Sequence, residues 1–259
     1  MTSDDRLVRT HSRLSGWQLV GAAYRLLRDH GREAVNIATV PTLIAIANSL
    51  VFSWAATGTL FWNHRADFDG RTMLWLMLFG AAYLWISGII FDRWTRHLLG
   101  TKKPVRPERP TFWSSWVLGC LVLGVGFAVI VAIVGIVLAP TGSVLFALIV
   151  SMPLAWVLSN LAAARLLLKA SLRASFLTTR PVLSEFVLQD WSRSGWAYAI
   201  APLPFLLGSI LLGKLADAVG GWVSVGWHLV EPVNGTISTL LIAAIGVVSI
   251  RSSMAGAVY

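Results

Sequence analysis

Few residues of this chain carry reactive or charged groups, and one charged pair lies at the end of a long apolar stretch. Lys214 and Asp217 are three residues apart, a spacing that lets two side chains meet on a helix. Pairing lowers the cost of partial burial, and ionisable residues in membrane helices mark ion and solute paths. We therefore treat Lys214 and Asp217 as a possible buried pair on such a path, or alternatively as an ordinary ion pair at the outer surface.

A ladder of basic residues is the second candidate site. Arg165, Lys169 and Arg173 recur every four residues, so a helix would carry them on one face. At the end of an apolar stretch such side chains suit lipid phosphates, or they only reach to the interface and set the topology. With three arginines nearer the start of the chain they form the predicted set of lipid-headgroup contacts: Arg25, Arg28, Arg32, Arg165, Lys169 and Arg173.

The N-terminal arginines accompany a predicted amphipathic helix. Ser15 and Gln18 have the spacing of a capping box, in which each side chain bonds the other residue's backbone N–H. An apolar stripe follows at spacings of three and four residues: Trp17, Val20, Tyr24 and Leu27. A helix with an apolar side and a basic side favours the plane of an anionic membrane surface. The alternative is that it packs against the protein's own cytoplasmic loops.

Signatures of catalysis and of metal binding are missing from the sequence. The five histidines are scattered, and no His-Glu-x-x-His motif, Walker loop, G-x-G-x-x-G fingerprint or G-x-S-x-G elbow occurs. The one cysteine, Cys120, lies in an apolar stretch and can form no disulfide within the chain. We expect a protein that is not an enzyme and that needs no cofactor or metal.

Composition identifies lipid as the main solvent of this protein. Hydrophobic residues make up 56% of its 259 residues and charged residues 13%, about half of the usual share. So few charges cannot cover the surface of a soluble domain of this length. The net charge of +9 would suit nucleic acid in a soluble protein, but here the basic residues stand between long apolar stretches. Anionic membrane lipid is therefore the predicted partner, and nucleic acid is not.

Six apolar stretches are long enough to cross a bilayer as helices, since about 20 residues are needed. No charge interrupts the chain between Arg109 and Arg165, but Ala139–Ser143 contains proline and glycine and predicts a turn. The predicted spans are Asn36–Leu60, Met73–Phe91, Trp116–Leu138, Val144–Leu166, Trp196–Gly213 and Pro232–Ile250, with no carboxylate at their centres. The sequence thus predicts an all-α integral membrane protein: six transmembrane helices, the N-terminal amphipathic helix and short cytoplasmic helices.

Two connections between the predicted spans have features of their own. Pro181 can open a short cytoplasmic helix, Pro181–Arg193, because proline suits the first helical position. We expect Ser192–Gly195 to end that helix before the fifth span. The tryptophan-rich stretch Leu215–Val230 either lies at the outer interface or re-enters the membrane.

The distribution of basic residues predicts the topology. All but three of the 21 Lys and Arg residues fall on one side of the six spans, the exceptions being Arg65, Arg71 and Lys214. By the positive-inside rule that side is cytoplasmic, and both termini lie on it. We predict a multi-pass protein of a bacterial inner membrane, with a basic cytoplasmic segment over residues 1–33 and a transmembrane domain over residues 34–259.

Two stretches of the chain resemble a known family. In Leu14–Ala47 a short amphipathic helix and an arginine-rich turn precede the first span. In Ala164–Leu206 a basic exit from one span leads to a tryptophan-containing helix before the next. This order is similar to that of uncharacterised bacterial six-span membrane proteins, which look like the membrane domain of some glycerophosphodiester phosphodiesterases. Neither stretch carries catalytic residues, so the resemblance implies no enzyme activity.

These features favour a non-enzymatic accessory or scaffold protein for other membrane components or lipids. Small residues spaced by four, such as Ala128 and Ala132, allow close contact with membrane-protein partners or with a second copy of the chain. The alternative is a small-solute or lipid transporter, which prolines within several spans and the Lys214/Asp217 pair favour. The expected absence of a carboxylate at the centre of any span favours the scaffold.

Overall fold

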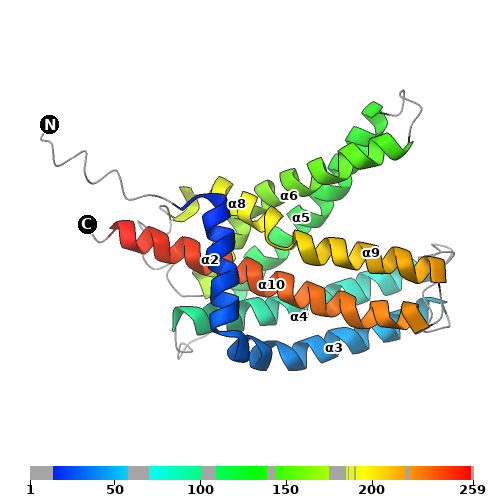
Figure 1. Cartoon of the computed structure of the whole chain (residues 1–259), viewed down its shortest axis with the longest axis horizontal. Helices are drawn as coiled ribbons and strands as arrows, with labels where there is room; N and C mark the ends of the chain where they lie inside the picture. Colours follow the sequence, from blue (N-terminus) through cyan, green and yellow to red (C-terminus); the bar gives the residue numbers. More distant parts are fainter. Residues whose placement is uncertain are drawn as a thin grey trace, which may run out of the picture. The chain divides into compact units, whose positions relative to one another are not determined.

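The structure is a computed structural model that describes residues 14–57, 70–100, 109–138, 144–174, 185, 187–189, 191–219 and 222–257. Within these ranges every regular element is a helix (Figure 1): α2 (Gly16–Asp29), α3 (Gly31–Thr57), α4 (Gly70–Leu99), α5 (Arg109–Leu138), α6 (Val144–Ala174), α8 (Trp191–Ile200), α9 (Leu203–Val219) and α10 (Trp222–Ala257). The prediction of an all-α fold is confirmed for this part of the chain. The predicted turn Ala139–Ser143 lies outside it, as do six of the thirteen residues of the predicted helix Pro181–Arg193.

Five helical stretches in the described part are apolar and long enough to cross a bilayer. They are Gly31–Ala55, Phe112–Leu138, Val150–Ala174, Trp191–Ala216 and Val225–Met254. The predicted second span, Met73–Phe91, lies inside the 30-residue helix α4, which is not one of the five, so the count of six stays a prediction. Large apolar side chains remain exposed along these helices, for example Val125, Ile133 and Ile136 on α5. Such a surface fits a protein embedded in lipid.

By its internal contacts the chain forms two compact units. The first unit comprises residues 1–25, 95–200 and 244–259, and the second comprises residues 26–94 and 201–243. The predicted boundary after residue 33 divides the chain by environment, into a cytoplasmic segment and a membrane domain. The two units are defined by contacts and do not test that boundary, which stays a prediction.

In the first unit, α5 and α6 lie side by side as a helical hairpin (Figure 1). A Cβ atom at Gly119 of α5 would lie 3.1 Å from the Leu167 Cδ2 of α6, so the missing side chain permits this close approach. Helix α8 also packs on α6, and the Trp156 Nε1 donates a hydrogen bond of 2.8 Å to the Ala199 carbonyl oxygen.

The expected helix end at Ser192–Gly195 is wrong, because these residues lie inside α8. The interruption comes instead at Ala201 and Pro202, between α8 and α9. Pro202 has no backbone N–H to continue the helix, while its carbonyl accepts bonds from the next helix. Gly195 serves packing, since a Cβ there would lie 3.0 Å from the Leu161 Cα atom of α6.

The last helix begins ten residues earlier than the predicted span. Helix α10 contains Pro232 in its interior, and proline is tolerated in membrane helices where neighbouring groups satisfy the backbone. Leu215–Val230 is therefore the end of α9 and the start of α10, with residues 220 and 221 outside the described part. As a result Glu231 lies within the candidate span Val225–Met254. The expectation that no carboxylate lies at the centre of a span stays a prediction, because Glu231 lies in the first third of this stretch.

Candidate functional site

The first candidate site is a set of polar side chains in the second unit, on α10 and on the helices that contact it. Glu231 is half-buried and follows the fully buried His228 by one helical turn. Within the described residues, no basic side chain forms an ion pair with Glu231. A carboxylate in a membrane span is rare and is by default a functional-site hypothesis. We refer to Ser49, Tyr83, His228, Glu231 and Asn234 as the Glu231 cluster.

Tyr83 of α4 approaches α10 beside Glu231. A Cβ atom at Gly235 would overlap with the Tyr83 Oη, so the hydroxyl rests against the glycine backbone. Gly235 follows Glu231 by four residues, and the two therefore share a face of α10. The glycine thus makes room for a phenol hydroxyl next to the carboxylate.

His228 connects α10 with α3. Its Nδ1 is 2.9 Å from the Ser49 Oγ, a hydrogen-bonding distance that holds the ring in one orientation. The neighbouring Trp227 ring meets the imidazole edge-on, with 5.4 Å between the ring centroids. His228 thus adds a fully buried imidazole of fixed orientation to the Glu231 cluster.

Asn234 connects α10 with α9. Its Nδ2 donates to the Phe205 carbonyl oxygen at 3.2 Å and to the Ser209 Oγ at 2.9 Å. The side-chain amide has two N–H donors, so both are used and Oδ1 remains as its acceptor. The Trp227 Nε1 donates to the Ser209 carbonyl oxygen at 3.3 Å, which adds a second link between the same helices.

Two further hydrogen bonds join α3 to its neighbours. Thr42 and Thr236 have their hydroxyl oxygens 2.9 Å apart, which links α3 to α10. The Asn48 Nδ2 donates to the Phe79 carbonyl oxygen of α4 at 3.3 Å. In a membrane such bonds between helices contribute about 0.6 kcal/mol each on average. The Glu231 cluster therefore lies among helices that several side-chain bonds hold together.

The sequence prediction misses Glu231 because it starts the sixth span at Pro232. Starting the span at Pro232 placed the preceding carboxylate in an outer loop. Two signals in the sequence point to the observed arrangement. Apolar residues already begin at Val223, and Glu231 is the one acidic residue after Asp217. No pattern in the sequence identifies Tyr83 as its neighbour, since that contact depends on packing between α4 and α10.

The predicted pair Lys214 and Asp217 lies on α9. The Lys214 side chain is exposed, and the side chain of Asp217 is outside the described part of the structure. A Cβ at the neighbouring Gly213 would lie 3.1 Å from the Trp227 Nε1, so this end of α9 packs on the start of α10. The pairing of Lys214 with Asp217 stays a prediction.

The second candidate site is the surface of α2. Its capping box is confirmed: Ser15 N donates to Gln18 Oε1 at 2.7 Å, and Gln18 N donates to Ser15 Oγ at 3.3 Å. Leu19, Val20 and Ala23 are buried and attach the helix to the protein. The predicted apolar stripe is therefore divided, because Val20 faces inward.

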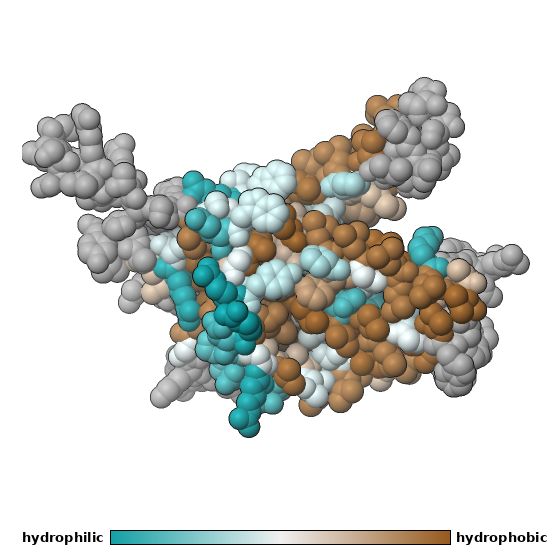
Figure 2. Space-filling model, in the orientation of Figure 1, coloured by the Kyte–Doolittle hydropathy of each residue, from teal (hydrophilic) through white to brown (hydrophobic). Residues whose placement is uncertain are grey.

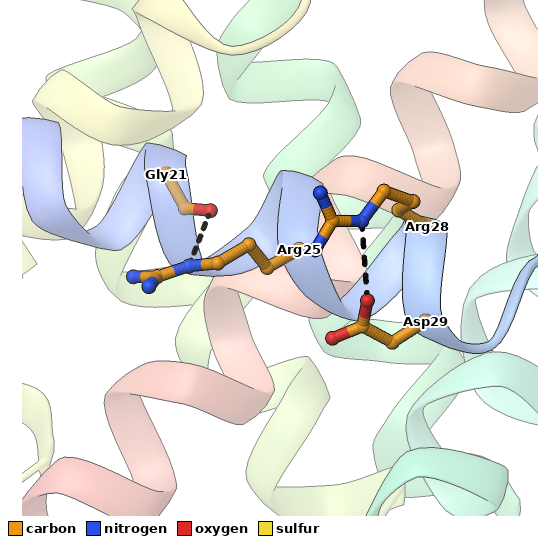
Figure 3. A network of polar contacts seen from close by, with 4 residues as sticks. All are labelled: Gly21, Arg25, Arg28 and Asp29. Atoms are coloured by element: carbon orange, nitrogen blue, oxygen red, sulfur yellow. Dashed lines mark hydrogen bonds and ion pairs between the residues drawn. The ribbon is translucent and has the colours of Figure 1, made fainter.

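The outward side of α2 combines an aromatic ring with guanidinium groups. Trp17 is 70% exposed, and Arg25 and Arg28 are also exposed. The Arg25 Nε donates to the Gly21 carbonyl oxygen at 3.4 Å, and the Arg28 Nε lies 3.2 Å from the Asp29 Oδ1 (Figure 3). Each bond uses one of the five N–H donors of its guanidinium and leaves others for an external anion. Hydrophilic residues follow this helix as a teal strip in Figure 2.

Tyr24 lies on the same helix and is half-buried. Partial burial raises the pKa of its phenol, because the charged form loses hydration. Tyr24 therefore stays neutral at physiological pH and adds an aromatic surface without charge next to the arginines. Arg32, at the start of α3, is exposed as well.

The basic ladder of α6 is confirmed as helical, and its members differ in surroundings. Arg165 is exposed and Lys169 half-buried. Arg173, also half-buried, donates to the hydroxyl oxygens of Ser114 and Ser115 at the start of α5. Arg173 thus helps to join the two ends of the hairpin, while Arg165 is the ladder residue most accessible to a headgroup.

No group of three or more His, Cys, Asp or Glu side chains that could hold a metal ion occurs among the described residues. Cys120 is a half-buried free thiol on α5. Comparisons of the chain with protein-family models, curated proteins and solved structures find no match.

Proposed function

We propose that this chain is a multi-pass bacterial inner-membrane protein that acts as an accessory or scaffold without catalysis of its own. In this proposal six helices cross the membrane, both termini are cytoplasmic, and α2 lies at the anionic cytoplasmic surface. Membrane lipids are its first partners, and other membrane proteins or a second copy of the chain are the components that it organises.

The observation that carries the proposal is the division of α2 into two faces. Leu19, Val20 and Ala23 attach one face to the protein, while Trp17 and the arginines stay exposed on the other. Exposed tryptophan and arginine are favourable at a lipid headgroup layer, where each basic residue contributes on the order of 1 kcal/mol. A helix fixed in this way can hold the rest of the protein at a defined depth and orientation.

Lipid dependence of thermal stability tests this role of α2. The purified full-length protein in neutral detergent should gain more stability from added phosphatidylglycerol than from phosphatidylcholine. Changing Arg25→Gln and Arg28→Gln together should remove most of that difference, whereas Lys214→Gln, an exposed basic residue predicted on the opposite side, should preserve it. An unchanged difference in the double variant would refute the lipid contact.

Purification from native membranes in mild detergent tests the scaffold itself. A membrane protein that co-purifies in fixed stoichiometry, or a stable homo-oligomer, supports it. A monomer that retains a small solute and no protein would favour the second candidate function, a small-solute or lipid transporter. Glu231 within a candidate span supports that alternative, since such carboxylates bind coupling ions in transporters.

A further inference from the structure

We propose that Glu231, Tyr83 and Asn234 form a binding site for a single positive charge, which arrives as a proton or as an alkali-metal cation. This site goes beyond the scaffold role. It requires neither the surface of α2 nor a partner protein.

Glu231 carries a charge that no described side chain balances. It lies within an apolar candidate span, and no described basic side chain forms an ion pair with it. An ionised carboxylate that has lost its hydration is strongly unfavourable unless a counter-charge approaches or the group takes up a proton. The described residues do not supply a counter-charge, and a cation or a proton from outside the protein would.

Tyr83 and Asn234 supply oxygen atoms within one helical turn of Glu231. The Tyr83 hydroxyl rests against Gly235, one helical turn from Glu231. Asn234 uses both N–H donors on Phe205 and Ser209, which leaves its Oδ1 as an acceptor. Carboxylate, hydroxyl and amide oxygens are the ligands that hard cations prefer, and a hydroxyl is also a partner for a protonated carboxyl.

The polar groups on the surrounding helices are uncharged, bonded to other residues or exposed. On α3, Ser49 bonds the His228 Nδ1, and on α4 the titratable group at this level is the Tyr83 phenol. On α9, Ser209 bonds Asn234 and Lys214 is exposed. His228, on α10 itself, is the one described side chain near the site that could also take up a proton.

Infrared difference spectroscopy on the full-length protein tests the site, with protons and Na⁺ as the two probes. If a proton fills it, the protein at neutral pH should show the carbonyl absorption of a protonated carboxyl, and Glu231→Gln should abolish that absorption. If an alkali cation fills it, Na⁺ added at constant pH should shift the carboxylate bands in the wild type and not in Glu231→Gln. Glu185→Gln, which removes an exposed carboxylate, is the matched control and should leave both signals intact.

Tyr83→Phe separates a binding site from a structural carboxylate. It removes one oxygen atom beside Glu231, so it should shift the protonated-carboxyl band or weaken the response to Na⁺ by several-fold, and it keeps the test valid if Glu231→Gln does not fold. If Glu231 shows neither a protonated form between about pH 5 and 8 nor a response to Na⁺, the proposal is overturned. It is equally overturned if His228→Gln, and not Glu231→Gln, removes the signals.

Discussion

Two close glycine contacts, one in each unit of this protein, meet different kinds of atoms. In the first unit, small residues bring backbones into direct contact, as where Gly195 of α8 meets the Leu161 Cα atom of α6. In the second unit, the glycine of closest approach, Gly235, faces the hydroxyl end of a tyrosine side chain. A backbone atom cannot move away without moving its helix, whereas a tyrosine hydroxyl can be removed or displaced.

This difference bears on function. Side-chain hydrogen bonds link α3, α4, α9 and α10 in the second unit, and each contributes little in a membrane. Such contacts can rearrange at low cost when a charge binds nearby. The first unit also has side-chain bonds, such as that from Trp156 to Ala199, and adds to them a backbone contact and densely buried alanine and leucine residues on α6. It is therefore better suited to hold α2 in place.

The largest expected effect is that of Gly195→Ala. The new Cβ would lie 3.0 Å from the Leu161 Cα atom and 3.2 Å from the Ala164 Cβ, so α8 has to shift. We expect the variant to lose about 1–3 kcal/mol of stability in a denaturant titration of the detergent-solubilised protein. Gly135→Ala on α5 is the control, because nothing lies within 4 Å of its Cβ position. Equal stability of the two variants would contradict the packing of α8 on α6.

The next largest effect is expected at Gly235, whose contact with the Tyr83 hydroxyl a second substitution can relieve. Gly235→Ala should destabilise the protein by about 1–3 kcal/mol, because its Cβ overlaps with the Tyr83 Oη. Adding Tyr83→Phe removes that oxygen and should restore part of the loss, although the Cζ atom at 3.0 Å still limits the space. A double-mutant cycle on the same titration measures the restoration, and strictly additive losses would rule out the contact.

Much of this architecture could be predicted from the sequence, because its signals are local. The capping box of Ser15 and Gln18, the hairpin of α5 and α6 and the helical ladder from Arg165 depend on residue types at short spacing. The continuation of α10 through Pro232 was not predictable in this way. A proline ends a helix or is accommodated in it according to its neighbours, and these come from distant parts of the chain.

A smaller effect is expected where Asn234 links α9 to α10. Asn234→Leu is close in volume and removes both hydrogen bonds to Phe205 and Ser209. Because bonds between membrane helices contribute about 0.6 kcal/mol on average, the loss should be about 1 kcal/mol in the same titration. If Asn234 also binds a cation, the variant should in addition lose the Na⁺ response, whereas a purely structural asparagine would affect stability alone.

The smallest effect is expected from removing the single hydrogen bond between Thr42 of α3 and Thr236 of α10. The Thr42 hydroxyl donates to the Ala38 carbonyl oxygen in its own helix, so it accepts the bond from Thr236. Thr42→Val and Thr236→Val should each cost little, and their coupling in a double-mutant cycle should be about 0.6 kcal/mol. Thr39→Val is the matched control, since Thr39 is exposed and donates to the Val35 carbonyl oxygen of its own helix. Coupling between Thr39 and Thr236 as large as that between Thr42 and Thr236 would show that the cycle reports a general change in α3 and not this bond.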